Sequence, residues 1–251
     1  VVNIHTSPQV EVCSPQTPMR LLLCAGLLLP CAHALALPKP TPPQHRTHRG
    51  DSRFFLDTAD VVEWARLLPL GIFHGVTTNP VLLQRAGVAC TIASCQELAQ
   101  QAFELGAGEV MLQAWGETSE AMVASGLALC AADAERIVIK VPVTAAGTQA
   151  ASVLISRGVR VCLTACYGSH QALVAVSVGA EYLAPYLGRM DDAGKNGHEE
   201  IEEMQSVVEG LGGSTRIFAA SIRHVDSLTR LAEAGVYTFT FSPDVARMLF
   251  E

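Results

Sequence analysis

From Arg53 onward the sequence alternates between short apolar runs and amphipathic stretches with helical periodicity. Apolar, β-branched runs of this length are typical of parallel strands that are buried on both faces. Repeated strand–helix units indicate an α/β fold with a parallel sheet. The eight runs cover residues 54–56, 72–76, 110–112, 137–143, 159–163, 182–186, 217–220 and 237–241. The helical stretches between them cover residues 60–68, 94–105, 119–132, 145–156, 169–178, 199–211 and 224–234.

Eight strand–helix units predict a (β/α)8 TIM barrel, with residues 51–251 forming one domain at the small end of the usual size range. A doubly wound open sheet is the alternative. Such a sheet normally carries a Gly-rich turn after its first strand, whereas the first run here ends in Leu56, Asp57 and Thr58. After the eighth run, Ser242 and Pro243 read as the start of a helix that stops with the sequence, so we expect this helix to be truncated.

Residues 1–50 differ from the rest of the chain and are predicted to be a leader outside the fold. Residues 19–36 have the form of a secretory signal peptide, with Met19, the basic Arg20, an apolar stretch and small residues. Residues 37–49 are rich in Pro, Thr, His and basic side chains and contain no acid. This order resembles the two-part leaders of algae with complex plastids, so we expect plastid delivery. Secretion is the alternative, as is a cytoplasmic location if the leader is an artefact of gene prediction.

Charge and cysteine usage exclude several classes of function. Residues 1–50 carry a formal charge of +3 and the whole chain −7, which leaves −10 for the rest. This negative charge on residues 51–251 argues against a surface that binds nucleic acid. The eight cysteines show no CxxC pair and no Cys/His metal spacing, and the five in the body fit buried thiols better than a disulfide framework. We therefore predict no metal. The leader's apolar stretch is shorter than the roughly 20 residues that a membrane-spanning helix needs.

The fourth run, residues 137–143, carries Lys140 at its centre. Burying an ammonium group is costly unless it is paired or loses its proton. One interpretation is that Lys140 lies at the end of a strand and extends its amine to solvent. The other is a desolvated lysine whose neutral amine attacks a carbonyl group and forms a Schiff base.

Polar side chains follow seven of the eight apolar runs. In a barrel, the C-terminal ends of the strands meet on one face and supply the catalytic groups. Individual members have structural alternatives, since Asp57 could cap the next helix and Asn79 could belong to a turn. A ring of such groups around a buried lysine nevertheless indicates an active site. Its members are Asp57, Thr77, Thr78, Asn79, Gln113, Lys140, Thr164, Tyr186, Arg189, Ser221 and Arg223.

Five motifs in unbroken order over residues 54–251 resemble the transaldolase family. They are FLDTAD (55–60), GVTTNP (75–80), VIKVPVT (138–144), APYLGRMDD (184–192) and AASIRH (219–224). This family contains transaldolases and fructose-6-phosphate aldolases, both class I lysine enzymes on a (β/α)8 barrel. The resemblance implies phosphorylated ketose and aldose substrates and no cofactor. It also implies a homo-oligomer, a pentamer or decamer, if the C-terminus were complete.

The resemblance assigns roles to the ring. Lys140 is the Schiff-base lysine, which attacks the C2 ketone of a ketose phosphate so that the iminium draws electrons from the breaking C3–C4 bond. Asp57 accepts the proton of the C4 hydroxyl. Gln113, Thr164 and Tyr186 are the remaining catalytic residues and hold a water molecule. The substrate-binding residues are Thr78 and Asn79 at the sugar and Arg189, Ser221 and Arg223 at the phosphate.

Two positions divide the family. Transaldolases carry Glu where this chain has Gln113, and they tend to have Phe where it has Tyr186, so this pair favours the fructose-6-phosphate aldolase subtype. Residues 188–192 and 221–224 look more like small transaldolases, which keeps a true transaldolase open as an alternative. A catalytically inactive sugar-phosphate-binding member is another. A deoxyribose-phosphate aldolase would need a second lysine near the first, and the only other one in the body, Lys195, lies in a polar loop.

Overall fold

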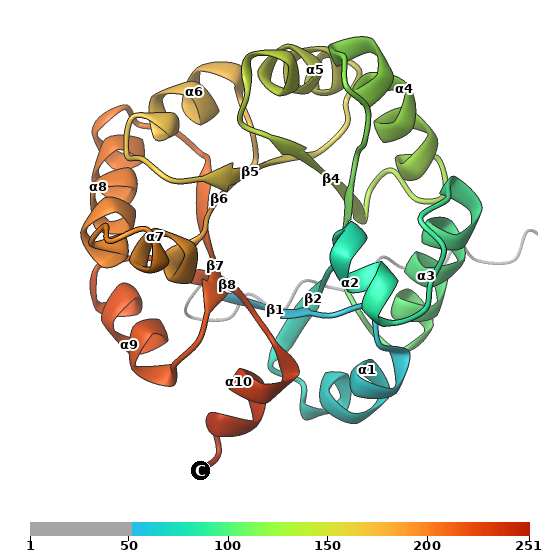
Figure 1. Cartoon of the computed structure of the whole chain (residues 1–251), viewed down its shortest axis with the longest axis horizontal. Coiled ribbons are helices and arrows are strands. Elements are labelled where there is room, and N and C mark those ends of the chain that lie inside the picture. The colour runs from blue at the N-terminus through green and yellow to red at the C-terminus, as the bar shows by residue number, and fades with distance from the viewer. Residues whose placement is uncertain (1–51) are drawn as a thin grey trace, which may run out of the picture. The chain divides into compact units, whose positions relative to one another are not determined.

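A computed structural model describes residues 52–251, so the predicted leader, residues 1–50, lies outside the described residues. Within this range, eight parallel strands close into a barrel in sequence order, and β8 pairs with β1. Figure 1 looks down this barrel and shows the ring of strands surrounded by helices. The strands are β1 (Arg53–Asp57), β2 (Phe73–Thr77), β3 (Glu109–Gln113), β4 (Ile137–Pro142), β5 (Val161–Cys166), β6 (Tyr182–Pro185), β7 (Arg216–Ile222) and β8 (Thr238–Phe241).

The helices of the described region alternate with these strands. They are α1 (Val61–Leu67), the 3-10 helix η1 (Leu68–Leu70), α2 (Pro80–Arg85), α3 (Ile92–Glu104), α4 (Ser119–Cys130), α5 (Ala145–Ser156), α6 (Gln171–Val178), α7 (Leu187–Asp192), α8 (Gly197–Gly210), α9 (Val225–Glu233) and α10 (Pro243–Met248). None of them is long and apolar enough to cross a membrane. The predicted TIM barrel is confirmed, and the closed pairing of β8 with β1 excludes the open sheet.

Side chains alternate between the inside of the barrel and the layer between strands and helices, as the period of two in a strand requires. Phe55, Met111, Val138 and Phe218 belong to one apolar cluster, which fills the barrel. Their neighbours, such as Leu56, Leu112, Ile139 and Ala219, belong to the larger cluster beneath the helices. A residue two positions beyond an interior residue therefore also points inward, but nearer the C-terminal mouth. The side chains two positions beyond the interior cluster therefore lie at the C-terminal mouth of the barrel.

The N-terminal end of the barrel is closed by a buried ionic network around Glu109. Its Oε1 atom accepts hydrogen bonds from Arg160 at 2.7 Å and Arg53 at 3.2 Å, and it lies 3.1 Å from His74 Nε2. Its Oε2 atom accepts from the Tyr182 hydroxyl at 2.8 Å. Burial opposes the charge, but the contacts with His74 and Arg160 outweigh it and lower the pKa of Glu109 to about 2.

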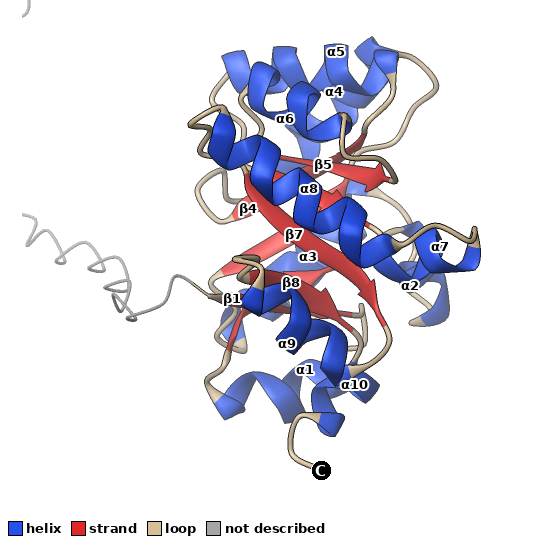
Figure 2. Ribbon diagram, turned by 90° about the vertical axis from the view of Figure 1, so that its left-hand side faces the viewer, coloured by secondary structure: helices blue, strands red, loops and turns tan. Residues whose placement is uncertain are grey.

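Two short helices, α2 and α7, follow β2 and β6 directly, and the sequence interpretation did not contain them. Figure 2 shows both at the end toward which the strand arrows point. The turn alternative for Asn79 and Pro80 is wrong, because Asn79 caps α2 and Pro80 occupies its first turn. Asp57 is not a helix cap either, since the cap of α1 is Asp60, which accepts from the Val62 amide at 2.8 Å.

Candidate active site

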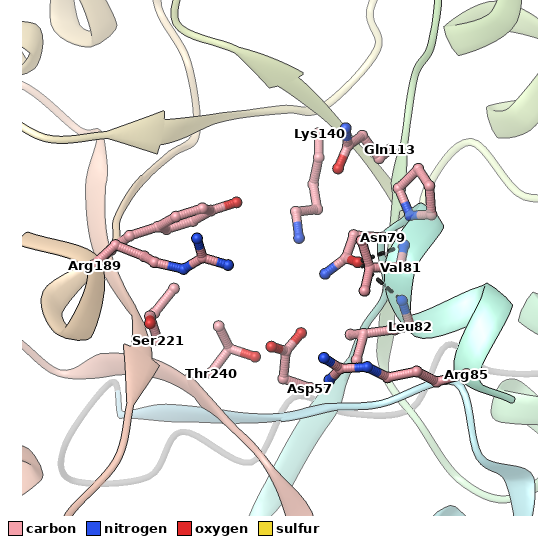
Figure 3. A pocket seen from close by; sticks show the side chains of 13 residues that line it. Asp57, Asn79, Val81, Leu82, Arg85, Gln113, Lys140, Arg189, Ser221 and Thr240 are labelled. Carbon is pink, nitrogen blue, oxygen red and sulfur yellow. Dashed lines mark hydrogen bonds between the residues drawn. The ribbon is translucent and has the colours of Figure 1, made fainter. Parts of the chain in front are cut away.

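The C-terminal ends of the strands surround a cavity of about 500 Å³ (Figure 3). Seven of the predicted site residues line it together: Asp57, Asn79, Gln113, Lys140, Tyr186, Arg189 and Ser221. The other lining residues are Pro80, Val81, Leu82, Arg85, Ala220 and Thr240. Four predicted residues, Thr77, Thr78, Thr164 and Arg223, are not among those that line it.

Lys140 lies on β4, two positions beyond the interior residue Val138, and Figure 3 shows its amine near the centre of the cavity. The residue is only 5% exposed, and Nζ donates a hydrogen bond to the Thr78 carbonyl oxygen at 3.1 Å. The interpretation of a lysine that extends to bulk solvent is therefore wrong. Opposite Lys140 on β5, burial raises the pKa of the Cys162 thiol to about 12, so this thiol is neutral and gives the amine no counter-ion.

Asp57 at the end of β1 faces Lys140 across the cavity (Figure 3). Its Oδ1 atom accepts a hydrogen bond from the Thr77 hydroxyl at 2.7 Å. The Thr77 hydroxyl in turn lies 2.6 Å from the hydroxyl of Thr240 on β8. The carboxylate is thus held by a hydroxyl pair that joins β2 to β8.

Asn79 contributes to the site through only one end of its amide. Its Oδ1 atom accepts from the backbone amides of Val81 and Leu82, both at 3.0 Å, and so it is committed to capping α2. Figure 3 shows the Nδ2 end pointing into the cavity, where it can donate a hydrogen bond. Thr78 is buried and its hydroxyl donates to the Met111 carbonyl oxygen at 3.2 Å, so it contacts the site only through its own carbonyl.

A second polar cluster lies on β5 and after β6. The hydroxyls of Thr164 and Tyr186 lie 2.7 Å apart, and Thr164 is buried behind the tyrosine. Tyr167 packs edge-on against the Tyr186 ring, with 5.8 Å between the ring centroids. Gln113 at the end of β3 also lines the cavity. Gln113 and Tyr186 can hold a water molecule or a substrate hydroxyl between them, with Thr164 orienting the Tyr186 hydroxyl.

The predicted phosphate residues do not all face the cavity. Arg189 and Ser221 line it, and Ser221 has a φ of 57°, in the left-handed region that is strained for a residue with a side chain. Arg223 instead forms a two-bond ion pair with Asp192 on the exposed surface, at 2.7 and 2.5 Å. It passes directly over Gly188, where an added Cβ would lie 2.7 Å from the Arg223 Nε atom.

Two functional candidates were missing from the sequence interpretation. Arg85 at the end of α2 extends toward Asp57 in Figure 3. Its place in the site could not be predicted from the sequence, because the helix α2 that carries it was not predicted. Thr240 could have been found, because it fills the one strand end to which no polar group was assigned. It alternates with Phe239 and Phe241, which face the helices.

The charges of the cavity favour an anionic ligand. The basic side chains of Lys140, Arg85 and Arg189 line it together with one carboxylate, Asp57, in a chain of net charge −7. A positive cleft in an acidic protein attracts anions selectively. No group of His, Cys, Asp and Glu within residues 52–251 could hold a metal ion.

A closed parallel barrel with a buried lysine and convergent polar groups at the C-terminal mouth defines a TIM-barrel enzyme. The chain belongs to the transaldolase/fructose-6-phosphate aldolase family, whose model matches residues 54–251. It is 37% identical over 197 residues to a probable transaldolase of Dinoroseobacter shibae, covering 78% of this chain and 88% of that protein. Probable transaldolases of Roseobacter denitrificans and Brucella ovis are 36% identical over the same shares. The chain is therefore a transaldolase-type enzyme.

Proposed function

We propose that this protein is a class I aldolase that makes and breaks the C3–C4 bond of ketose phosphates through a Schiff base on Lys140. The observation that carries the proposal is the buried Lys140 amine at the centre of a polar, cationic cavity. Within residues 52–251 the Lys140 amine contacts a neutral carbonyl oxygen and no carboxylate, which suits it to nucleophilic attack. The family membership supports the same chemistry.

In the proposed reaction, the Lys140 amine adds to the C2 ketone and water leaves, which produces an iminium ion. Asp57 then accepts the proton of the C4 hydroxyl as the C3–C4 bond breaks. The electron pair of that bond moves to the iminium and gives an enamine, while C4 becomes the carbonyl carbon of the released aldose phosphate. Asn79 donates from Nδ2 to a substrate hydroxyl in this arrangement.

For the phosphate group we propose Arg189 and Ser221 as direct contacts, since both line the cavity. A planar guanidinium group suits the forked geometry of a phosphate dianion. Arg223 joins them only if it exchanges Asp192 for the phosphate. Because that ion pair is exposed and such pairs contribute little, the exchange costs little.

We propose the fructose-6-phosphate aldolase subtype. Gln113 cannot relay a proton, so the water that adds to the iminium is held by the Tyr186 hydroxyl, which the Thr164 hydroxyl orients from 2.7 Å away. In this subtype the three-carbon unit is released as dihydroxyacetone. The second candidate is a true transaldolase, which passes the unit to an aldose phosphate, and the relatives that are named probable transaldolases favour it.

The test of the mechanism is borohydride reduction in the presence of fructose 6-phosphate, followed by mass spectrometry. We expect the adduct on Lys140 and none in Lys140→Met. Lys195→Met is the matched control, because Lys195 bonds to the Tyr167 carbonyl oxygen and Glu200 away from the cavity. An adduct on Lys195, or a wild type that binds the sugar without forming any adduct, would refute the Schiff-base proposal.

The subtype is tested separately by following free dihydroxyacetone with and without erythrose 4-phosphate. The aldolase subtype predicts its release from fructose 6-phosphate alone. Transfer that requires erythrose 4-phosphate and leaves no free dihydroxyacetone would assign the enzyme to the transaldolases instead.

A further inference from the structure

The Thr77 hydroxyl lies between the Asp57 carboxylate and the Thr240 hydroxyl, at 2.7 and 2.6 Å. Thr77 is 0% and Thr240 2% exposed, although Thr240 reaches the cavity wall. We propose that Thr77 and Thr240 are positioning residues that fix the Asp57 carboxylate for proton transfer. This inference rests on the proposed function, because it assumes that Asp57 is the base of the cleavage step.

The direction of the hydrogen bonds follows from counting hydrogens. An ionised carboxylate only accepts, so the single hydrogen of the Thr77 hydroxyl is committed to Asp57 Oδ1. Thr77 then has none left for its other neighbour, and Thr240 must be the donor in the second bond. The two hydroxyls therefore form a chain in which every donor points toward the carboxylate. Such chains strengthen each bond by polarisation.

The position of Asp57 depends on these two hydroxyl groups, because no other side chain among the described residues holds its carboxylate. Among the described residues Asp57 makes no ion pair, and Thr77 is the one side chain that donates a hydrogen bond to it. With Oδ1 occupied by Thr77, Oδ2 is the oxygen left for the substrate hydroxyl. A base must meet the proton it removes at hydrogen-bond distance, and small displacements reduce the rate strongly.

The two steps of the reaction separate this role from a merely structural one. Formation of the iminium from dihydroxyacetone and Lys140 involves no C4 hydroxyl and so needs no base at that position. Cleavage of the C3–C4 bond does need it. Loss of the hydroxyl chain should therefore slow cleavage while borohydride trapping of dihydroxyacetone on Lys140 continues. Damage to the fold would slow both.

The experiment compares Thr77→Val, Thr240→Val and the double variant, each of which removes a hydroxyl and keeps the shape of the side chain. We expect kcat for fructose 6-phosphate cleavage to fall about tenfold or more in each, with KM and the rate of dihydroxyacetone trapping nearly unchanged. The losses should not add in the double variant, because Thr240 acts through Thr77. Thr240→Ser restores the hydroxyl and should restore kcat.

Thr238→Val is the matched control. Thr238 lies on the same strand and face, two residues before Thr240, and it is 0% exposed. Its hydroxyl has no hydrogen-bond partner among the described residues, so its removal should leave kcat unchanged. Circular dichroism and thermal melting follow the fold of every variant. If Thr77→Val does not fold, the comparison of Thr240→Val with Thr240→Ser and Thr238→Val is sufficient to test whether the Thr240 hydroxyl is needed for cleavage.

Two results would overturn the inference alone: normal cleavage by Thr240→Val, or cleavage and trapping that fall together in folded variants. Trapping of the wild type on Lys140 in the same experiment shows that the proposed function survives such a result. Failure of the wild type to trap dihydroxyacetone on Lys140 would instead overturn the proposed function, and this inference with it.

Discussion

At the scale of single residues, the cavity presents cations from two sides. Arg189 lies on one wall, and Arg85 extends from α2 on the opposite side, near Asp57 (Figure 3). Arg85 is exposed and makes no ion pair within the described part of the chain. It therefore remains available to an approaching anion, whereas Arg223 is engaged by Asp192.

We expect Arg85→Gln to raise the KM for fructose 6-phosphate about fivefold, since a cation at the cavity rim attracts the phosphate dianion. The KM for dihydroxyacetone should change little, because this sugar is uncharged. Steady-state kinetics at low and high salt measure both, and the effect should shrink as salt increases. Arg157→Gln is the control, since it removes an equal charge at the loop before β5, at the far end of the barrel. Equal changes in both variants would contradict a local role for Arg85.

A second residue-scale prediction concerns Tyr186. Tyr186→Phe should reduce kcat roughly a hundredfold, the size typical of a lost acid–base group, if its hydroxyl, oriented by Thr164, holds the reacting water. Tyr167→Phe is the control because it removes a hydroxyl from the ring packed against Tyr186. A Tyr186→Phe variant with wild-type turnover would favour the transaldolase alternative, in which this position tolerates Phe.

Most of the cavity residues were predictable because they follow apolar runs at strand ends, where the alternation of side chains decides their direction. Lys140 and Gln113 are examples, since each follows an interior residue by two positions. The direction of Arg223 was not predictable. It depends on Asp192 and on the space above Gly188, which are brought together by the fold and not by sequence spacing.

At the scale of elements, the strands converge on Glu109 at the N-terminal end of the barrel. Arg53 on β1, His74 on β2, Arg160 before β5 and Tyr182 on β6 all contact its carboxylate. Removing one partner from such a buried network leaves the others uncompensated, which is strongly destabilising.

This network predicts a stability loss in acid. The pKa of Glu109 is about 2 in the folded state against 4.5 for the free side chain. Because the folded value is depressed, the stabilisation is complete above about pH 4.5 and is lost as the pH falls toward 2; it amounts to about 3 kcal/mol. Urea unfolding at pH 7, 4.5 and 3 measures it. Glu109→Gln should be less stable at pH 7, and its free energy of unfolding should no longer fall between pH 4.5 and 3 on account of this carboxyl group. The exposed control Glu97→Gln should match the wild type.

Eight strands and seven long helical stretches were predictable from apolar periodicity, and α5 has the predicted bounds. The helices α2 and α7 were not, because six residues are too few for a helical period to show. Both follow a strand end at the cavity. Their positions depend on capping and packing at the mouth, which short local patterns do not reveal.

At the scale of the whole molecule, the chain combines the described barrel with a predicted leader. We expect residues 1–50, fused to a fluorescent protein in an alga with a complex plastid, to direct it to the plastid. Deletion of residues 37–50 should retain the reporter in the secretory pathway, since only the signal peptide would remain. Fluorescence microscopy with plastid and endomembrane markers distinguishes these outcomes. A reporter that stays in the cytosol would contradict the leader prediction.

The hydroxyl pair of Thr77 and Thr240 also has a consequence for the time course of synthesis. The two residues are 163 positions apart, and they belong to the second and the last strand of the barrel. Asp57 leaves the ribosome among the first residues of the fold, but the strand that completes its support leaves last. Closure over such a separation is slow. Until it occurs, the nascent barrel exposes two unpaired edges, at β1 and at the latest strand made. If the hydroxyl pair positions Asp57 as proposed, the barrel becomes both protected and catalytically competent in the same late event.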